Sequence, residues 1–261
     1  MGQHWYTKDA EPMHWITGAN GNERDTTLRD AKKQTELGLR PSVTTILGVL
    51  DKPALNMWKQ RQLIEAALTL PMAKDESLDD FIKRIPQDAF EGATEARDRG
   101  ELIHGCIENL IKGTSEHYED DVMQIAECAI EDIYRHTGQQ VFGAECTVSD
   151  DAGFGGMIDL SNDIWVIDHK TKDITNKQWD LYTEGKDPKL HYPEHCMQLS
   201  AYSHALGGGH RLLNVFIDRM IPGRVILHEW DRSMYEGFEY ILRYWQWSKQ
   251  YWPLNKEADN D

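Results

Sequence analysis

The stretch from residue 155 to residue 171 constrains the fold of this chain more than any other. Residues 157–160 and 164–167 are apolar runs of strand length, and the turn-forming pair Asn162 and Asp163 lies between them. We therefore expect a β-hairpin around which the other elements are arranged. Side chains alternate between the two faces of a strand, so such a hairpin sorts its residues onto two opposite faces.

Three charged side chains lie in this apolar hairpin: Asp159, Asp168 and Lys170. Asp168 and Lys170 share a face because they are two residues apart on one strand. A two-residue loop would place Asp159 opposite Val166 and Met157 opposite Asp168. All three charged side chains would then point to one side, whereas a three-residue loop without a bulge would turn Asp159 away.

Two carboxylates on one face repel each other unless a cation lies between them. Oxygen ligands suit a hard ion such as Mg²⁺ or Mn²⁺, and a lysine beside the ion can hold or deprotonate a water that the ion polarises. The alternative is an ordinary hairpin with two surface carboxylates and a salt-bridging lysine. A D-x-K tripeptide is short enough to occur often by chance.

The composition indicates one large folded domain, or one domain with an extension, because the chain has 261 residues and 40% of them are hydrophobic. The N-terminus lacks a signal-peptide core, and no apolar run reaches the length of a membrane span. The four cysteines are widely spread, which indicates reduced thiols of a cytoplasmic protein. A net charge of −16 argues against a strongly basic nucleic-acid binder, although a narrow basic channel can exist on an acidic body.

Apolar periodicity predicts the other elements. We expect a packed strand or hairpin and a short helix within residues 1–40, an acidic segment broken by Pro86 over 72–93, and a polar loop over 172–193. The remaining predicted elements are helices over 43–50, 55–68, 94–111, 115–135, 194–206 and 232–251, and strands over 140–148, 212–218 and 224–230.

Two helices carry candidate site residues. Ser42 is a good N-cap, and the helix N-terminus behind it could bind a phosphate with help from Lys59 or Arg61. The alternative there is a simple capped helix with solvated charges. His104 lies one turn after Gly100 and could bind a metal ion, although a lone helical histidine is more often a core or surface residue.

Five short motifs follow one another along the chain: P-S-V-T at 41–44, G-x-x-x-H from Gly100 to His104, G-x-x-D from Gly156 to Asp159, D-x-K-T from Asp168 to Thr171, and Q-x-x-x-Y from Gln198 to Tyr202. Each motif is weak alone. In this order, over about residues 41–245, they resemble the PD-(D/E)XK nuclease superfamily. The resemblance is to its RecB-like exonuclease branch, which includes phage exonucleases and the mitochondrial genome-maintenance exonuclease.

The resemblance implies an α/β fold in which helices flank a central mixed β-sheet. This is a restriction-endonuclease-like, PD-(D/E)XK core with an N-terminal helical extension. Residues 1–93 would form the extension and a helical region packed on the core. Residues 94–261 would form the nuclease core itself.

The resemblance also implies roles for individual residues. His104, Asp159, Asp168 and the backbone carbonyl of His169 would bind the metal, and Lys170 would orient or deprotonate the attacking water.

Gln198 and Tyr202 would contact the DNA backbone or brace Lys170, which makes them candidates for both catalysis and DNA binding. The remaining candidates are the DNA-contacting Ser42, Thr44 and Lys59, and two carboxylates without an assigned role, Glu145 and Glu108.

The implied activity is that of a Mg²⁺- or Mn²⁺-dependent DNA exonuclease acting on single strands or duplex ends, in phage or bacterial recombination, repair or DNA degradation. A structure- or site-specific endonuclease of the same fold and a non-catalytic binding protein are the alternatives. Relatives with an iron–sulfur cluster have three cysteines after the Q-x-x-x-Y motif. No cysteine follows Cys196 here, so no cluster is expected. The chain has no Walker A motif, so a helicase or recombinase would be a separate partner.

Overall fold

The structure is a computed structural model, and it describes residues 4–18 and 20–253. Its centre is a five-stranded mixed sheet in the order β5-β6-β7-β8-β9. Only β7 and β8 are parallel, and the other neighbours are antiparallel. The strands are β5 (Gly143–Asp150), β6 (Phe154–Ser161), β7 (Trp165–Lys172), β8 (Arg211–Asp218) and β9 (Val225–Trp230).

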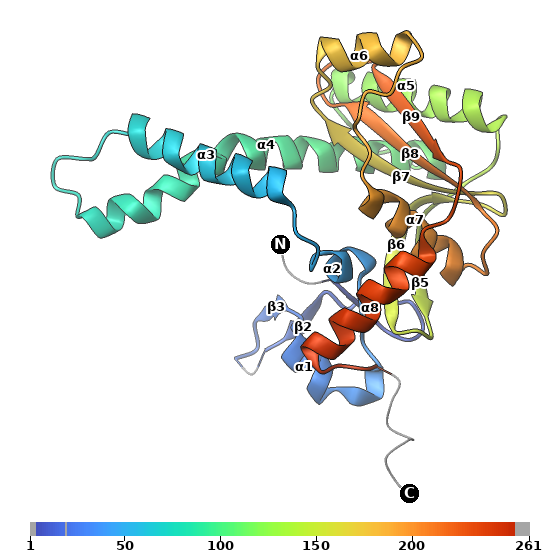
Figure 1. The fold of residues 1–261 in the computed structure, drawn as a ribbon, viewed down its shortest axis with the longest axis horizontal. Coiled ribbons are helices and arrows are strands. Elements are labelled where there is room, and N and C mark those ends of the chain that lie inside the picture. Colours follow the sequence, from blue (N-terminus) through green and yellow to red (C-terminus); the bar gives the residue numbers. More distant parts are fainter. Residues whose placement is uncertain (1–3, 19, 254–261) are drawn as a thin grey trace, which may run out of the picture.

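Helices cover both faces of this sheet (Figure 1), so the predicted α/β class with a mixed sheet flanked by helices is confirmed. One face packs on α4 and α5 through an apolar cluster that includes Ile103, Ile125 and Ile167. The opposite face packs on α7 and α8 through a second cluster that includes Val166 and Leu199. The helices are α4 (Leu78–Lys112), α5 (Asp120–Thr137), α7 (Pro193–Ala205) and α8 (Tyr235–Lys249).

The N-terminal elements that the structure describes, from Trp5 to Leu47, pack on the α7 and α8 side of the core. Trp5, Val43 and Ile46 are fully buried there with Trp245 and Phe238 of α8. These apolar contacts attach the N-terminal elements to the rest of the structure. The elements are β1 (Trp5–Tyr6), β2 (Trp15–Thr17), β3 (Glu23–Asp25), α1 (Leu28–Lys33), η1 (Thr35–Leu37), β4 (Arg40–Pro41) and α2 (Val43–Leu47).

Helix α3 (Pro53–Thr69) and the first half of α4 form an arm that projects from the body (Figure 1). Ala66 is the buried residue of α3, and the buried residues of α4 begin at Gly100. The expectation that all of residues 1–93 packs on the core is therefore wrong for the arm. A boundary between residues 93 and 94 falls inside α4, so the helix carries the chain continuously from the arm into the core.

Two sequence-based expectations about secondary structure are wrong. Pro86 lies inside α4 without ending it. Proline removes one backbone donor, but Ile82, whose carbonyl would have accepted that bond, is 53% exposed on the arm, where water can replace the donor. The predicted loop 172–193 contains α6 (Asn176–Thr183), which begins with a capping box formed by Thr175 and Gln178.

The central hairpin has a longer loop than predicted. Ser161 pairs with Val166, and residues 162–164 lie between the two strands. Asn162 stabilises it, because its side-chain oxygen accepts hydrogen bonds from the backbone N–H groups of Ile164 (2.9 Å) and Trp165 (2.8 Å). The register differs from the predicted one by two residues. A shift of two leaves every strand residue on the same face, so the alternation of side chains alone cannot reveal it.

Candidate active site

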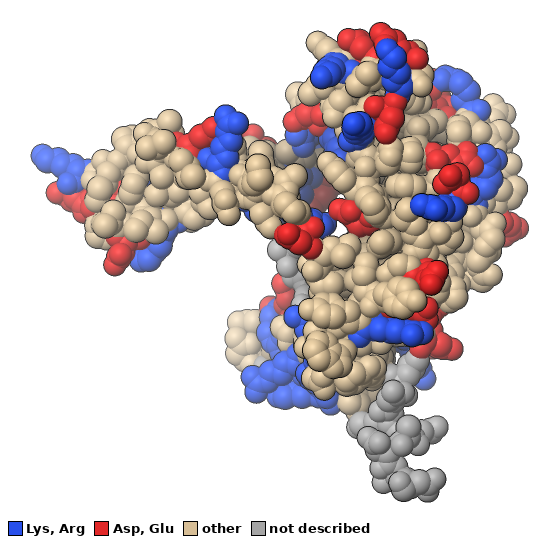
Figure 2. All heavy atoms as spheres, viewed as in Figure 1, with Lys and Arg blue, Asp and Glu red and all other residues tan. Residues whose placement is uncertain are grey.

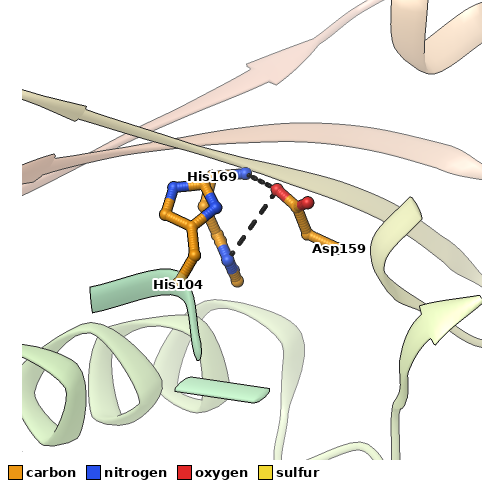
Figure 3. A group of neighbouring side chains, drawn as sticks. All are labelled: His104, Asp159 and His169. Carbon is orange, nitrogen blue, oxygen red and sulfur yellow. Dashed lines mark hydrogen bonds and ion pairs between the residues drawn. The ribbon is translucent and has the colours of Figure 1, made fainter. Parts of the chain in front are cut away.

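Three side chains from three elements converge beside β7 (Figure 3). They are His104 of α4, Asp159 of β6 and His169 of β7, and their ligand atoms all lie within 4.8 Å of one another. Asp159 Oδ2 accepts a hydrogen bond from the backbone N–H of His169 at 2.6 Å and lies 3.9 Å from Nδ1 of its ring. We call these three residues the His–Asp–His group.

An irregularity between β5 and β6 turns Asp159 toward the two histidines. Glu145 has a positive φ of 52°, and the regular pairing skips Glu145 and Asp159 while continuing on both sides of them. Ile158 then packs in the α7-side cluster and Leu160 in the α4-side cluster, although they are two residues apart. Strict alternation fails at Asp159, so the prediction that its side chain shares a face with Asp168 and Lys170 is wrong.

Close packing of α4 on β7 places His104. A Cβ atom on Gly100 would lie 2.4 Å from Thr171 Oγ1, so the helix reaches this distance because residue 100 is glycine. His104 is one turn further along the same helix face, where its ring meets the ring of His169 edge-on at 5.6 Å between centroids. The G-x-x-x-H spacing therefore has a direct packing explanation.

The donor set of the His–Asp–His group fits a divalent cation. Burial lowers the pKa of His169 to about 3, with a further contribution from nearby His104, so the His169 imidazole is neutral and has a free lone pair. His169 Nε2 is buried and has no hydrogen-bond partner among the described residues. Two imidazoles and one carboxylate are common ligands of divalent transition ions.

A second group of polar side chains lies on the α7 side of β7. Lys170 Nζ donates to Asp168 Oδ1 at 2.8 Å and to Gln198 Oε1 at 3.3 Å. Gln198 Nε2 also donates to Asp168 Oδ1, at 2.9 Å, and Asn214 Nδ2 donates to Asp168 Oδ2 at 2.8 Å. The predicted shared face of Asp168 and Lys170 is confirmed by these contacts.

Asp168 is almost completely enclosed, with 4% of its surface exposed. Burial raises the pKa of the Asp168 carboxyl, while the ammonium of Lys170 opposes that rise. Three donors facing one carboxylate are a strong arrangement for holding it in the ionised form. Its carboxylate is not part of the His–Asp–His group, so metal ligation by Asp168 stays a prediction.

Gln198 and Tyr202 brace the site from α7. They are 8% and 3% exposed, and Gln198 Nε2 lies 3.3 Å from the Tyr202 hydroxyl. Gln198 also accepts from Lys170 Nζ at 3.3 Å, and Tyr202 contacts Gln198, which is compatible with a supporting role. Contact of either residue with a DNA backbone stays a prediction.

The two carboxylates without an assigned role line the same small cavity as the His–Asp–His group. Glu108 follows His104 by one turn of α4, and Glu145 lies at the irregularity in β5. Burial raises the pKa of Glu145, and the neighbouring Glu108 raises it further. The cavity is about 20 Å³ in volume, close to the size of a single water molecule.

The amino-terminal candidates differ in their exposure to solvent. Ser42 is 3% exposed, and its hydroxyl accepts the backbone N–H of Thr45 at 3.1 Å, so Ser42 serves as the cap of the five-residue helix α2. A phosphate contact by Ser42 stays a prediction. Thr44 is exposed next to it, and Lys59 is exposed on the arm.

Sequence reasoning missed two contributors. His169 was expected to act through its backbone carbonyl, and the structure adds its ring. Asn214 was not considered, although a polar residue inside the apolar run 212–217 is itself an anomaly that points to a specific hydrogen-bond partner.

The close approach of the hairpin to α7 gives a testable prediction. A Cβ atom on Gly156 would lie 2.4 Å from Cε1 of the buried Tyr202 ring. We expect Gly156→Ala to reduce the free energy of unfolding by about 1–3 kcal/mol through overpacking, and to lower any catalytic activity that depends on the Tyr202–Gln198 brace. Chemical denaturation measures the stability.

Gly92→Ala is the matched control for this substitution. Gly92 lies in α4, and no neighbouring described residue has an atom within 4 Å of the place that an added Cβ would take. Alanine there should leave stability unchanged or raise it by up to about 1 kcal/mol, because alanine favours the helix. Equal effects of the two substitutions would contradict the steric explanation.

Comparisons with known proteins give little at the level of sequence. No protein-family model matches the chain, and no curated protein matches it. Among solved structures, the alkaline exonuclease LHK-Exo from Laribacter hongkongensis is similar at 18% identity over 58% of this chain and 79% of that one, with a TM-score of 0.36. The structure of LHK-Exo in complex with dAMP matches at 17% identity over 72% and 86% of the two chains, also with a TM-score of 0.36.

Proposed function

We propose that this protein is a divalent-metal-dependent DNA exonuclease that hydrolyses phosphodiester bonds of single strands or duplex ends. One observation carries the proposal. The Lys170 ammonium is held by Asp168 of β7 and Gln198 of α7, and Lys170 follows His169 of the His–Asp–His group, which is suited to a divalent ion. An ion-binding group beside a positioned lysine is the combination that metal-assisted phosphodiester hydrolysis requires.

His104, Asp159 and His169 would hold the ion, and Asp168 would complete its coordination with Lys170 as its partner. A bound divalent ion supplies charge stabilisation at the scissile phosphate and lowers the pKa of a coordinated water. Lys170 orients the attacking water and receives or donates a proton at Nζ. Gln198 fixes the Lys170 ammonium and the Asp168 carboxylate relative to each other. Its Oε1 accepts from Lys170 Nζ at 3.3 Å, and its Nε2 donates to Asp168 Oδ1 at 2.9 Å.

The imidazoles in the donor set favour Mn²⁺ over Mg²⁺, because nitrogen ligands bind transition ions more strongly than they bind Mg²⁺. We propose Mg²⁺ or Mn²⁺ as the working ion and expect higher activity at low concentrations of Mn²⁺. DNA is the proposed substrate, any helicase or recombinase is a separate partner, and the cytoplasm of a bacterial or phage-infected cell is the proposed location. Among the described helices, none is long and apolar enough to span a membrane.

An end-labelled substrate assay tests the function. Linear and circular DNA, single and double stranded, are incubated with Mg²⁺, Mn²⁺ or a chelator. An exonuclease degrades linear molecules progressively and leaves circles intact, because it needs an end. Cleavage of circular single strands would favour an endonuclease of the same fold, and no cleavage of any substrate would favour a binding protein.

The surface charge predicts a shallow dependence of DNA binding on salt. The chain carries a net charge of −16, and Figure 2 shows Lys and Arg interspersed with Asp and Glu over the visible face. Few phosphates can then be neutralised, and the log–log slope of affinity against salt scales with their number. We expect a slope well below about eight, measured by fluorescence anisotropy of labelled single strands with a catalytically inactive variant. A steeper slope would require a large basic surface.

A further inference from the structure

A chain of directed hydrogen bonds runs across β8 to Asp168. Trp230 Nε1 of β9 donates to Asn214 Oδ1 at 2.8 Å, and Asn214 Nδ2 of β8 donates to Asp168 Oδ2 at 2.8 Å. The three residues lie on neighbouring strands, because Asp168 is paired with Asn214 in the β7–β8 ladder. These hydrogen bonds end on Oδ2, whereas Lys170 and Gln198 donate to Oδ1.

The chemistry of tryptophan fixes which group donates and which accepts in these two hydrogen bonds. An indole N–H can only donate, so the Asn214 side chain must present its oxygen to Trp230. Its NH₂ group is then forced to face Asp168. Without the indole, the Asn214 amide could rotate by half a turn and present an acceptor oxygen to the carboxylate instead, which would be repulsive.

Burial shows that the amide of Asn214 serves these two contacts. Asn214 is 0% exposed, and its side chain has no other hydrogen-bond partner among the described residues. Its neighbours Leu213 and Val215 point to the other face of the sheet and pack in the α4-side cluster. A buried amide costs free energy unless both of its ends are satisfied, and an apolar residue would pack there without that cost.

We propose that Asn214, oriented by Trp230, is a positioning residue that fixes the Asp168 carboxylate for ion binding and for Lys170; this inference rests on the proposed function. Lys170 and Gln198 both hold Oδ1, so Asn214 is the one described side chain that holds Oδ2. Loss of the Asn214 contact frees the carboxylate to turn about its Cβ–Cγ bond. The ammonium of Lys170, which donates to Oδ1, is then displaced with it.

A double-mutant cycle on the full-length protein tests the proposal. Asn214→Ala, Trp230→Phe and the double variant are compared with wild type by calorimetric titration of Mn²⁺ without DNA, and by single-turnover DNA cleavage. We expect Asn214→Ala to weaken Mn²⁺ binding about 10-fold and to slow cleavage about 10- to 100-fold with DNA affinity unchanged, as for outer-shell partners of metal ligands. Trp230→Phe should have an effect of about 3-fold, and none in the Asn214→Ala background.

Trp247→Phe is the matched control, because Trp247 is 64% exposed on α8. It should change neither Mn²⁺ affinity nor cleavage. If Asn214→Ala does not fold, a comparison of Trp230→Phe with Trp247→Phe still tests the hydrogen bonds from Trp230 through Asn214 to Asp168. Trp230 is only half-buried, and Asn214 is retained in both variants.

Two outcomes would overturn the inference. Mn²⁺ affinity and cleavage that do not change in Asn214→Ala would show that the amide has only a packing role. Equal effects of Trp230→Phe in both backgrounds would show that the indole does not act through Asn214. A wild-type protein that binds Mn²⁺ but cleaves no DNA would refute the proposed function, while the Mn²⁺ cycle would still decide the inference.

Discussion

Replacement of Lys170 by alanine is expected to lower the single-turnover rate of DNA cleavage by about 10³-fold, because water positioning and charge stabilisation are both lost. The ammonium is held at the site by Asp168 Oδ1 at 2.8 Å and Gln198 Oε1 at 3.3 Å. Lys170 is not a candidate ligand, and its side chain is 27% exposed. The fold and the Mn²⁺ affinity should therefore remain largely intact, which circular dichroism and calorimetry measure.

Lys170→Arg separates the charge from the chemistry. Arginine keeps the positive charge, but guanidinium is bulkier and cannot act as a base, so it should not restore full activity. Lys177→Ala is the matched control, since Lys177 is exposed on α6 away from these contacts. Near-equal cleavage rates in wild type and Lys170→Ala would remove Lys170 from the mechanism and favour a binding protein.

Asp168→Asn is expected to abolish measurable cleavage, with a loss of at least about 10³-fold. Oδ1 accepts from Lys170 and Gln198, and Oδ2 accepts from Asn214. An asparagine must point its NH₂ group at one of these donors, so one buried donor loses its partner and faces another donor. The negative charge that would help to bind the ion is lost in the same step.

Asp163→Asn is the control for this change, because Asp163 is an exposed carboxylate in the loop of the same hairpin. It should retain wild-type cleavage and Mn²⁺ affinity. Undiminished cleavage by Asp168→Asn would refute the assignment of Asp168 to the site and direct attention to the His–Asp–His group alone.

Much of the secondary structure follows from the sequence because it depends on local periodicity. The predicted strand 212–218 agrees with β8 within one residue, and the predicted helix 194–206 agrees with α7 within one residue at each end. The predicted helix 94–111 is the core half of α4. Its arm half was missed because a proline inside a helical pattern usually indicates a break.

The candidate site could be predicted in part for the same reason. Residues two apart on a strand share a face, and this rule placed Lys170 beside Asp168. Residues four apart on a helix also share a face, and this rule placed Tyr202 beside Gln198. The turn of Asp159 toward His104 could not be predicted. This orientation of Asp159 depends on the irregularity at Glu145. Glu145 is far from Asp159 in the sequence, and the two become neighbours only when β5 pairs with β6.

By itself, the sequence determined the order of the elements, the central hairpin and the pairing of charged residues within single strands and helices. These features depend on the alternation of apolar and polar residues, which is a local property of the chain. The tertiary structure decided which side chains meet across elements: His104 with Asp159 and His169, and Asn214 with Asp168 and Trp230. Such meetings depend on how closely a helix approaches a sheet and on where a strand departs from regular pairing, and side-chain periodicity carries information about neither.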